Sequence, residues 1–252
     1  MHRFLVIAAF FLTTLSISSC DSSGAKVTVA AAASMEPLLT EMVKEFEKDK
    51  GITVEFIWGS SGSLSNKIIE GAPYDVFFSA ARTFSQRVAD EGDAMGAPKE
   101  FCQGQLAVIF PDTGWGIQDL LRDEVSYISI PDPKAAPYGQ SAMAWLRNFP
   151  WSDQIEHKLV YTTNAAGVIN HLDQGVAEVG ITAESLAQKH YSEDRYLSLK
   201  DEKGFNAPTH YLLCLNDREE TRKFRIHIEE FAQNEGYQSS FQDYGFQSLS
   251  VK

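Results

Sequence analysis

The sequence predicts an α/β protein with largely parallel sheets, on three observations. Short apolar segments alternate with amphipathic ones, as where Val27–Ala33 is followed by apolar residues at helical spacing up to Phe46. Small or hydroxylic residues stand at several turns from strand to helix. The 252 residues are 44% hydrophobic, which suffices for one large domain or two smaller ones with cores of their own. Helices interleaved with short buried strands are typical of this fold class.

The first strand, Val27–Ala33, leads into a helix whose ends are marked in the sequence. Ser34 stands at the expected N-cap, and Pro37 fits the first helical turn. Gly51 ends the helix. The elements expected next are strand Thr53–Trp58, a helix between the turn 59–63 and Gly71, strand Asp75–Ala80 and helix Phe84–Glu91.

The alternation continues through the rest of the chain. The elements expected in order are strand Gln105–Phe110, helix Ile117–Arg122, strand Ser126–Ile130, a Pro-rich loop Pro131–Tyr138, helix Gln140–Asn148, strand Lys158–Thr163, helix Ala165–Gln174, strand Val179–Thr182, strand His210–Leu215 and a long amphipathic helix from about Arg218 to Asn234.

The N-terminus has the features of a secretory signal. Arg3 precedes the apolar run Phe4–Leu12, which is too short to span a membrane because a spanning helix needs about 20 apolar residues. Ile17-Ser18-Ser19-Cys20 resembles a bacterial lipobox, in which the signal is cut before a cysteine whose thiol is lipidated. We therefore expect residues 1–19 to be a signal peptide and residues 20–25 to be a lipidated cysteine with its tether. The alternative is an ordinary signal peptide that is cut elsewhere.

Charge and cysteine content limit the partners. The formal net charge of −12 disfavours nucleic acid and anionic lipid surfaces. An anionic ligand would therefore be held by local dipoles and not by the overall field.

After Cys20, only Cys102 and Cys214 remain, and the sequence leaves open whether they pair or stay as two thiols.

Four strand-to-helix turns form a candidate anion site. They are Ala32-Ala33-Ser34, Ser60-Ser61-Gly62, Pro137-Tyr138-Gly139 and the Thr-Asn-Ala-Ala-Gly segment 163–167. Ligands of open α/β sheets bind beyond the carboxyl ends of strands, where free N–H groups and the helix dipole favour an anion. No Lys, Arg or His lies in these turns, so a site built from them favours fully ionised molybdate, tungstate or sulfate over phosphate. Each turn taken alone is also an ordinary helix start, and spacing leaves both interpretations open.

Two segments carry a specific resemblance. VTVAAAASM (27–35) and GSSGSLSNKIIEGAPYDVFFSA (59–80) resemble the bacterial periplasmic molybdate-binding proteins of ABC transporters. The likeness continues more thinly through 131–142, 162–182 and 244–246, and covers nearly all of the mature chain. It implies a type II periplasmic-binding-protein fold, with two α/β lobes joined by two crossover strands and a ligand cleft between them. The implied lobes are 26–103 plus 208–252, and 104–207.

The resemblance also implies the site residues. Ser34 and Ser61 would supply hydroxyl and backbone donors from the first lobe, and the N–H groups of Tyr138 and Ala165 would supply donors from the second. Possible further contacts are Ser60, Asn164 and Thr182. Molybdenum would be bound only as its oxyanion, with no direct protein ligand to the metal and no cofactor.

One position departs from the family pattern. Members often place a tyrosine hydroxyl on the anion after a "GI-x-Y" strand, whereas this chain has Gly180-Ile181-Thr182-Ala183. Our hypothesis is that the hydroxyl of Tyr138 or of Thr182 replaces this donor. The departure keeps a binding protein of the same fold for sulfate, phosphonate or a small organic anion as the alternative.

The implied mechanism is capture of the anion between the lobes, which stabilises the closed state for the importer. Expected partners are the membrane permease subunits of an ABC transporter and the oxyanion. We expect a lipid-anchored monomer in the periplasm or on the outer face of the cell membrane, without nucleic acid.

An enzyme is the alternative from another class. Gly59-Ser60-Ser61-Gly62 does not match the Gly-x-Ser-x-Gly motif of serine hydrolases, and no His-Glu-x-x-His motif is present. His171 and His227 are expected on helices as surface or packing residues. Asp75 is expected as a structural cap and not as a general base. We therefore predict that the chain is not an enzyme.

Overall fold

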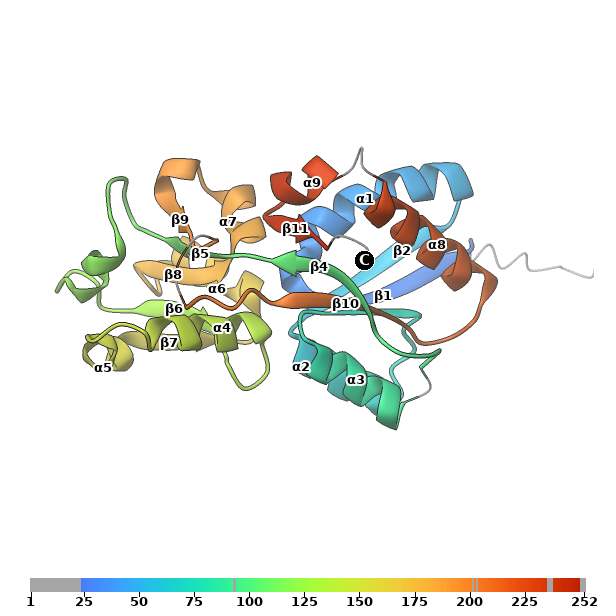
Figure 1. The fold of residues 1–252 in the computed structure, drawn as a ribbon, viewed down its shortest axis with the longest axis horizontal. Coiled ribbons are helices and arrows are strands. Elements are labelled where there is room, and N and C mark those ends of the chain that lie inside the picture. Colours follow the sequence, from blue (N-terminus) through green and yellow to red (C-terminus); the bar gives the residue numbers. More distant parts are fainter. Residues whose placement is uncertain (1–23, 93, 201, 203, 235–237, 250–252) are drawn as a thin grey trace, which may run out of the picture.

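The computed structural model describes residues 24–92, 94–200, 202, 204–234 and 238–249. It has two α/β lobes, joined by extended crossover segments that leave β4 and enter β10 (Figure 1). The strands of a six-stranded sheet come from residues 26–104 and 209–248, and those of a five-stranded sheet come from 106–198. The predicted α/β class and the two-lobed type II fold are confirmed.

The strands are β1 Lys26–Ala32, β2 Thr53–Gly59, β3 Val76–Ser79, β4 Lys99–Gly104, β5 Leu106–Ile109, β6 Ile128–Pro131, β7 Leu159–Thr162, β8 Val179–Ala183, β9 Tyr196–Ser198, β10 Thr209–Cys214 and β11 Phe246–Ser248. The α-helices are α1 Glu36–Lys50, α2 Ser61–Ile69, α3 Arg82–Glu91, α4 Pro137–Leu146, α5 Ser152–Ile155, α6 Ala165–Asp173, α7 Glu184–His190, α8 Glu219–Gln233 and α9 Gln238–Asp243. Short 3-10 helices are η1 Ala33–Met35, η2 Ile117–Leu121, η3 Glu156–Lys158 and η4 Glu193–Arg195.

Both sheets are mixed, so the prediction of largely parallel sheets is wrong. In the larger sheet, ordered β11-β4-β10-β3-β1-β2, the parallel pairs are those of β1 with β2 and with β3. In the smaller sheet, ordered β7-β6-β8-β5-β9, they are those of β6 with β7 and with β8. The crossovers cause the difference. Since β10 returns from the other lobe, it enters the larger sheet at the end where β1 and β3 finish and pairs antiparallel with β3.

Local differences from the predicted elements have physical reasons. α4 begins at Pro137 and not at Gln140, because proline fits the first turn of a helix. Tyr138 therefore belongs to a helix and not to a loop. The segment Ile117–Leu121 is a 3-10 helix. The pattern does not predict β4, β9, β11, α5, α7 and α9, which are short or, for Lys99–Gly104, lack an apolar run.

Ser34 is not the N-cap that the sequence predicts. It lies inside η1, and α1 begins at Glu36 with Met35 at its cap position and no capping side chain. The hydroxyl of Ser34 faces His210 instead. The other end of α1 agrees with the prediction, because Gly51 adopts φ 63° as its C-cap, a left-handed conformation that favours glycine.

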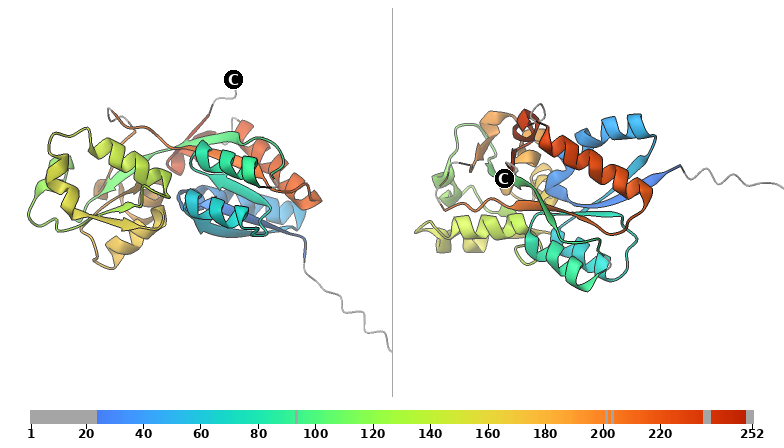
Figure 2. Two further views of the ribbon diagram at one scale, coloured as in Figure 1. Left: turned by 90° about the horizontal axis from the view of Figure 1, so that it is seen from below. Right: turned by 45° about the vertical axis from the view of Figure 1, so that its right-hand side comes forward.

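Two helix layers cover the larger sheet (Figures 1 and 2). Successive side chains of a strand point to opposite faces. Val29 and Phe78 accordingly pack with residues of α1 and α8, whereas Phe77 packs with residues of α2 and α3. Both layers are continuous apolar clusters, so the carboxyl ends of β1 and β3 are held rigidly at the boundary with the other lobe.

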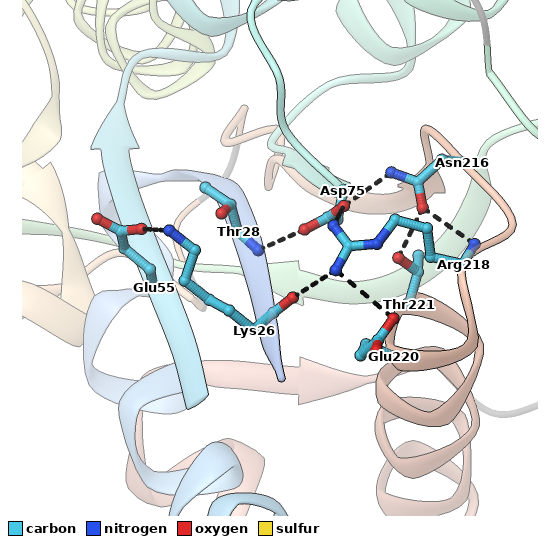
Figure 3. Close-up of polar contacts among 8 residues, drawn as sticks. All are labelled: Lys26, Thr28, Glu55, Asp75, Asn216, Arg218, Glu220 and Thr221. Atoms are coloured by element: carbon cyan, nitrogen blue, oxygen red, sulfur yellow. Dashed lines mark hydrogen bonds and ion pairs between the residues drawn. The ribbon is translucent and has the colours of Figure 1, made fainter. Parts of the chain in front are cut away.

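The buried carboxylate of Asp75 joins chain segments at the opposite end of this sheet (Figure 3). Asp75 Oδ2 accepts from the Thr28 N–H at 2.7 Å, and Oδ1 accepts from Asn216 Nδ2 at 2.8 Å and from Arg218 Nη1 at 2.9 Å. Arg218 Nη2 also donates to the Lys26 carbonyl oxygen at 2.9 Å. The predicted structural role of Asp75 therefore extends to joining β1, β3 and the start of α8.

The two described cysteines are free. Cys102 of β4 lies opposite His210, and Cys214 stands four residues further along β10, opposite Val76. That offset is about 13 Å along the strand, beyond the reach of a disulfide. The alternative of two thiols is therefore the correct one.

Residues 1–23, with the expected signal peptide and Cys20, lie outside the described residues. Within the described part of the chain, no helix is long and apolar enough to cross a membrane.

Candidate functional site

The four predicted turns converge where the lobes meet. Ala32 and Ala80, at the ends of β1 and β3, share one apolar cluster with Tyr138 and Ala165 of the smaller lobe. η1 also contacts α6. The fold therefore brings together starts of helices that lie more than a hundred residues apart in the chain.

Ser34 is buried at the end of β1. Its Oγ lies 3.1 Å from His210 Nε2. Its carbonyl oxygen accepts from Ser185 Oγ, on α7 of the other lobe, at 2.6 Å. Small side chains at Ala31–Ala33 allow this close approach of the two lobes.

The serines at the start of α2 have different roles. Ser60 is the N-cap, and its Oγ accepts from the Ser63 N–H at 3.3 Å. Ser61 is fully buried, and its Oγ accepts from the Ala80 N–H at 2.9 Å. This bond fixes the Ser61 oxygen and leaves its hydroxyl proton available for donation.

Glycine is required at position 62, beside Ser61. The Gly62 N–H donates to the Ala135 carbonyl oxygen of the other lobe at 2.9 Å. A Cβ at this position would lie only 2.9 Å from the same oxygen. Only glycine allows the backbones of the two lobes to approach this closely.

Tyr138 presents a buried phenol in the first turn of α4. Its Oη has no hydrogen-bond partner of regular geometry among the described residues. Burial chiefly raises the pKa of Tyr138, with Cys102 and Glu184 adding to the effect and the Ser34 hydroxyl opposing it, so the phenol is neutral. Oη lies against Gly104, where any Cβ would overlap it. Tyr138 thus has an uncommitted donor inside the protein.

The start of α6 is held by two side chains. Asn164 caps it by accepting from the Gly167 N–H at 3.0 Å. Thr182 Oγ1 donates to the Ala165 carbonyl oxygen at 2.8 Å, so its proton is committed to the backbone. The first N–H groups of a helix have no partner within it, which applies to Ala165 at the start of α6 and to Tyr138 in α4.

His210 is a residue of this cluster that the sequence interpretation missed. It is fully buried in β10, with its ring centroid 5.9 Å from that of Tyr138 and 5.3 Å from that of Phe246. Burial lowers the pKa of His210 to about 3, although the carbonyl groups of Cys102 and Pro208 act in the opposite direction. The imidazole is therefore neutral. No local signal marks this histidine, because the crossover alone brings it to Ser34.

The other histidines considered from the sequence, His171 and His227, are not part of this cluster. His171 Nδ1 lies 3.0 Å from Ser129 Oγ, and His227 Nε2 lies 2.9 Å from the Met42 carbonyl oxygen, which are packing contacts. Among the described residues, no group of three His, Cys, Asp or Glu side chains is arranged to hold a metal ion.

The sequence of residues 27–247 matches the family model described as bacterial extracellular solute-binding protein. The chain belongs to this family. The solute-binding protein is therefore not an enzyme but the substrate-binding component of an ABC transporter, which works outside the cytoplasm with membrane permease subunits.

Two curated relatives resemble this chain in sequence over most of its length. The solute-binding protein is 28% identical over 264 residues to YvgL of Bacillus subtilis (strain 168), named as an ABC transporter substrate-binding lipoprotein, covering 97% of this chain and 98% of YvgL. It is 30% identical to the molybdate-binding protein ModA of Azotobacter vinelandii, covering 68% of this chain and 69% of ModA.

A solved structure supports the fold. The periplasmic molybdate-binding protein of Azotobacter vinelandii superposes with a TM-score of 0.76 at 19% identity, over 90% of this chain and 100% of that one.

Proposed function

We propose that this solute-binding protein binds molybdate or tungstate between its lobes, through neutral donors only. The observation that carries the proposal is the convergence of the buried hydroxyls of Ser34, Ser61 and Tyr138 with the first N–H groups of α4 and α6. The names of curated relatives, molybdate-binding proteins among them, support the ligand.

The donor set suits a fully ionised tetrahedral anion. Hydroxyl and backbone N–H groups at helix starts favour negative charge without a cationic side chain. Of the two hydroxyls considered as replacements for the family tyrosine, we assign the role to Tyr138, because the Thr182 proton is bonded to Ala165. We assign the remaining contacts to Ala165 N–H, Ser61 and Ser34, with Ser60 and Asn164 capping the helices that carry them.

The size of the anion allows the site to discriminate molybdate and tungstate from sulfate. Molybdate and tungstate have longer bonds to oxygen than sulfate, so a rigid donor set spaced for them leaves sulfate under-bonded. Each unmet donor costs about 1–3 kcal/mol. The serines stand on elements fixed by the two apolar layers of the larger lobe, which supplies the required rigidity.

Closure of the lobes is the signal to the transporter. Contacts across the lobes join Gly62 to Ala135, Ser34 to Ser185 and Glu36 to Lys189. An anion that bonds to both lobes stabilises this closed state by its differential affinity, and the permease recognises it.

The proposal also includes the organisation of the chain. We take 26–103 plus 208–252 and 104–207 as its lobes; the strands of the two sheets support this division, except that Gly104 belongs to β4 of the larger sheet. We further propose cleavage after residue 19, lipidation of Cys20 and a monomeric state. The lipoprotein name of YvgL supports the anchor.

A second candidate is another oxyanion, with sulfate as the main competitor. Ala183 ends β8 at the position where the family resemblance implies a ligand tyrosine, which favours a changed donor set. The alternative is decided by the same measurement as the main proposal.

The test is a calorimetric titration of the chain without residues 1–25, using molybdate, tungstate, sulfate and phosphate in turn. We expect tight one-to-one binding of the first two and none of the last two. Tight binding of sulfate alone would favour the second candidate, and binding of none of the four would reject both.

A further inference from the structure

Ser34 connects the proposed anion position to a buried imidazole. Ser34 Oγ lies 3.1 Å from His210 Nε2, and both residues are buried, at 1% and 0% exposure. Tyr138 lies next to both, with its ring beside His210 and its phenol influenced by the Ser34 hydroxyl. A ligand that bonds to Ser34 therefore acts on His210 through a single oxygen atom.

The direction of the Ser34 proton depends on His210. A neutral imidazole carries one N–H, and its other nitrogen is an acceptor. Nδ1 has no hydrogen-bond partner of regular geometry among the described residues, but the carbonyl groups of Cys102 and Pro208 raise the pKa of the ring and are compatible with a proton on Nδ1. With that proton on Nδ1 alone, Nε2 accepts from Ser34, whose hydroxyl proton then points away from a bound anion.

We propose that His210 is a positioning residue of the oxyanion site, which takes up one proton from solvent when the anion binds. The imidazolium then donates Nε2–H to Ser34 Oγ and keeps Nδ1–H towards the backbone carbonyls. Ser34 in turn donates its hydroxyl proton to the anion, and the proton returns to solvent when the anion leaves. This inference rests on the proposed function and deepens it.

The surroundings of His210 permit this change. The titratable groups facing it are the Cys102 thiol of β4 and the Tyr138 phenol of α4, both kept neutral because burial raises their pKa values. Phe246 of β11 supplies an apolar ring, and Glu184 of α7 acts on Tyr138. In this low-dielectric environment a doubly negative ion beyond Ser34 is a strong stabiliser of the imidazolium.

The sign of the pH dependence follows. Without the anion, burial lowers the pKa of His210 to about 3, so the ring is neutral in neutral solution. The bound anion raises that pKa, so affinity increases as pH falls through the raised value and levels off near the pKa of about 3 of the free protein.

The test is calorimetry of molybdate binding to the purified protein in two buffers of different ionisation enthalpy at one pH. We expect the apparent binding enthalpies in the two buffers to differ in proportion to the difference between the ionisation enthalpies of the buffers. The proportionality should correspond to uptake of up to one proton per bound anion. The affinity should rise by up to tenfold per pH unit lowered. Equal enthalpies in both buffers would overturn the proposal, and this result requires no variant.

Two matched variants separate positioning from charge. In His210→Gln, the side-chain amide nitrogen lies near the position of Nε2, so it can donate to Ser34 but cannot titrate. In His210→Asn, the amide nitrogen lies near the position of Nδ1 and does not reach Ser34. We expect His210→Gln to bind within fivefold of the native protein but with no proton uptake. We expect His210→Asn to lose at least tenfold in affinity, with unfolding temperatures confirming that both variants fold.

The outcomes distinguish the two proposals. Proton uptake that persists in His210→Gln, or native affinity in His210→Asn, would overturn the role of His210 and leave the proposed function intact. Failure of the native protein to bind either molybdate or tungstate would reject the proposed function itself, and the role of His210 with it.

Discussion

Gly62 of one lobe donates its N–H to the carbonyl oxygen of Ala135 in the other, at 2.9 Å, directly after the buried Ser61. The closed state thus includes a backbone bond between lobes within one residue of the proposed ligand contact. Because this bond joins the two lobes directly, it stabilises the closed state and so lowers the free-energy cost of closure that the anion has to offset.

The first prediction concerns this contact. Gly62→Ala places a Cβ about 2.9 Å from the Ala135 oxygen and 3.1 Å from Phe84, so we expect it to disfavour closure and lower molybdate affinity by about tenfold. Small-angle scattering should show a more open molecule without the ligand. The matched control is Gly71→Ala, at an open surface turn, which should leave affinity unchanged despite its strained φ of 91°.

The second prediction concerns Ser61. Ser61→Ala removes a hydroxyl that accepts from the Ala80 N–H and is proposed to donate to the anion, so affinity should fall about 10–100-fold and stability by about 1 kcal/mol. Titration calorimetry and urea unfolding measure the two effects. Ser63→Ala, an exposed neighbour on the same helix, is the control and should change neither. Unchanged affinity in Ser61→Ala would contradict the proposed contact.

The third prediction separates Tyr138 from a purely structural residue. Tyr138→Phe removes a buried hydroxyl that lacks a regular partner, so the empty protein should be as stable as the native one or more stable. Affinity for molybdate should nevertheless fall by tenfold or more. If affinity is retained, Tyr138 does not replace the family tyrosine.

The fourth prediction concerns the far end of the larger lobe. Asp75→Asn removes the charge that accepts from Arg218, Asn216 and Thr28, and we expect a loss of about 1–3 kcal/mol of stability, measured by urea unfolding. Anion affinity should not change. Asp217→Asn, which breaks an exposed pair with Arg222, is the control and should cost less than about 0.5 kcal/mol. A larger effect on binding than on folding would show that Asp75 is not merely structural.

Periodicity predicted the elements that are long and apolar. The first helix, the strand before it and the helix after Ser60 were expected near their observed positions, because local patterns define them. The strand β4 was missed because Lys99–Gly104 is mostly polar and is buried only by its neighbours. Strand direction was missed because it depends on where the chain crosses between lobes.

The site was predicted as far as helix starts define it. The four turns do meet at the boundary between the lobes, but their roles in binding remain predictions. Ser34 was expected both as a cap and as a ligand contact, because the two roles have the same local sequence; the cap is wrong and the contact stays a prediction. His210 was missed because its partner lies 176 residues away and no local pattern joins them.

The chain enters its fold at Lys26, whose carbonyl oxygen is held by Arg218 and whose strand lies between β2 and β3. A pull on the preceding residues acts along β1, so it loads the hydrogen bonds of both neighbouring ladders together in shear instead of opening them one at a time. A force applied at this end is therefore resisted by the hydrogen bonds of the larger sheet, far from the crossover segments. If Cys20 is lipidated as proposed, a pull through that anchor is borne by β1 and its two neighbouring strands and not by the crossover segments between the lobes.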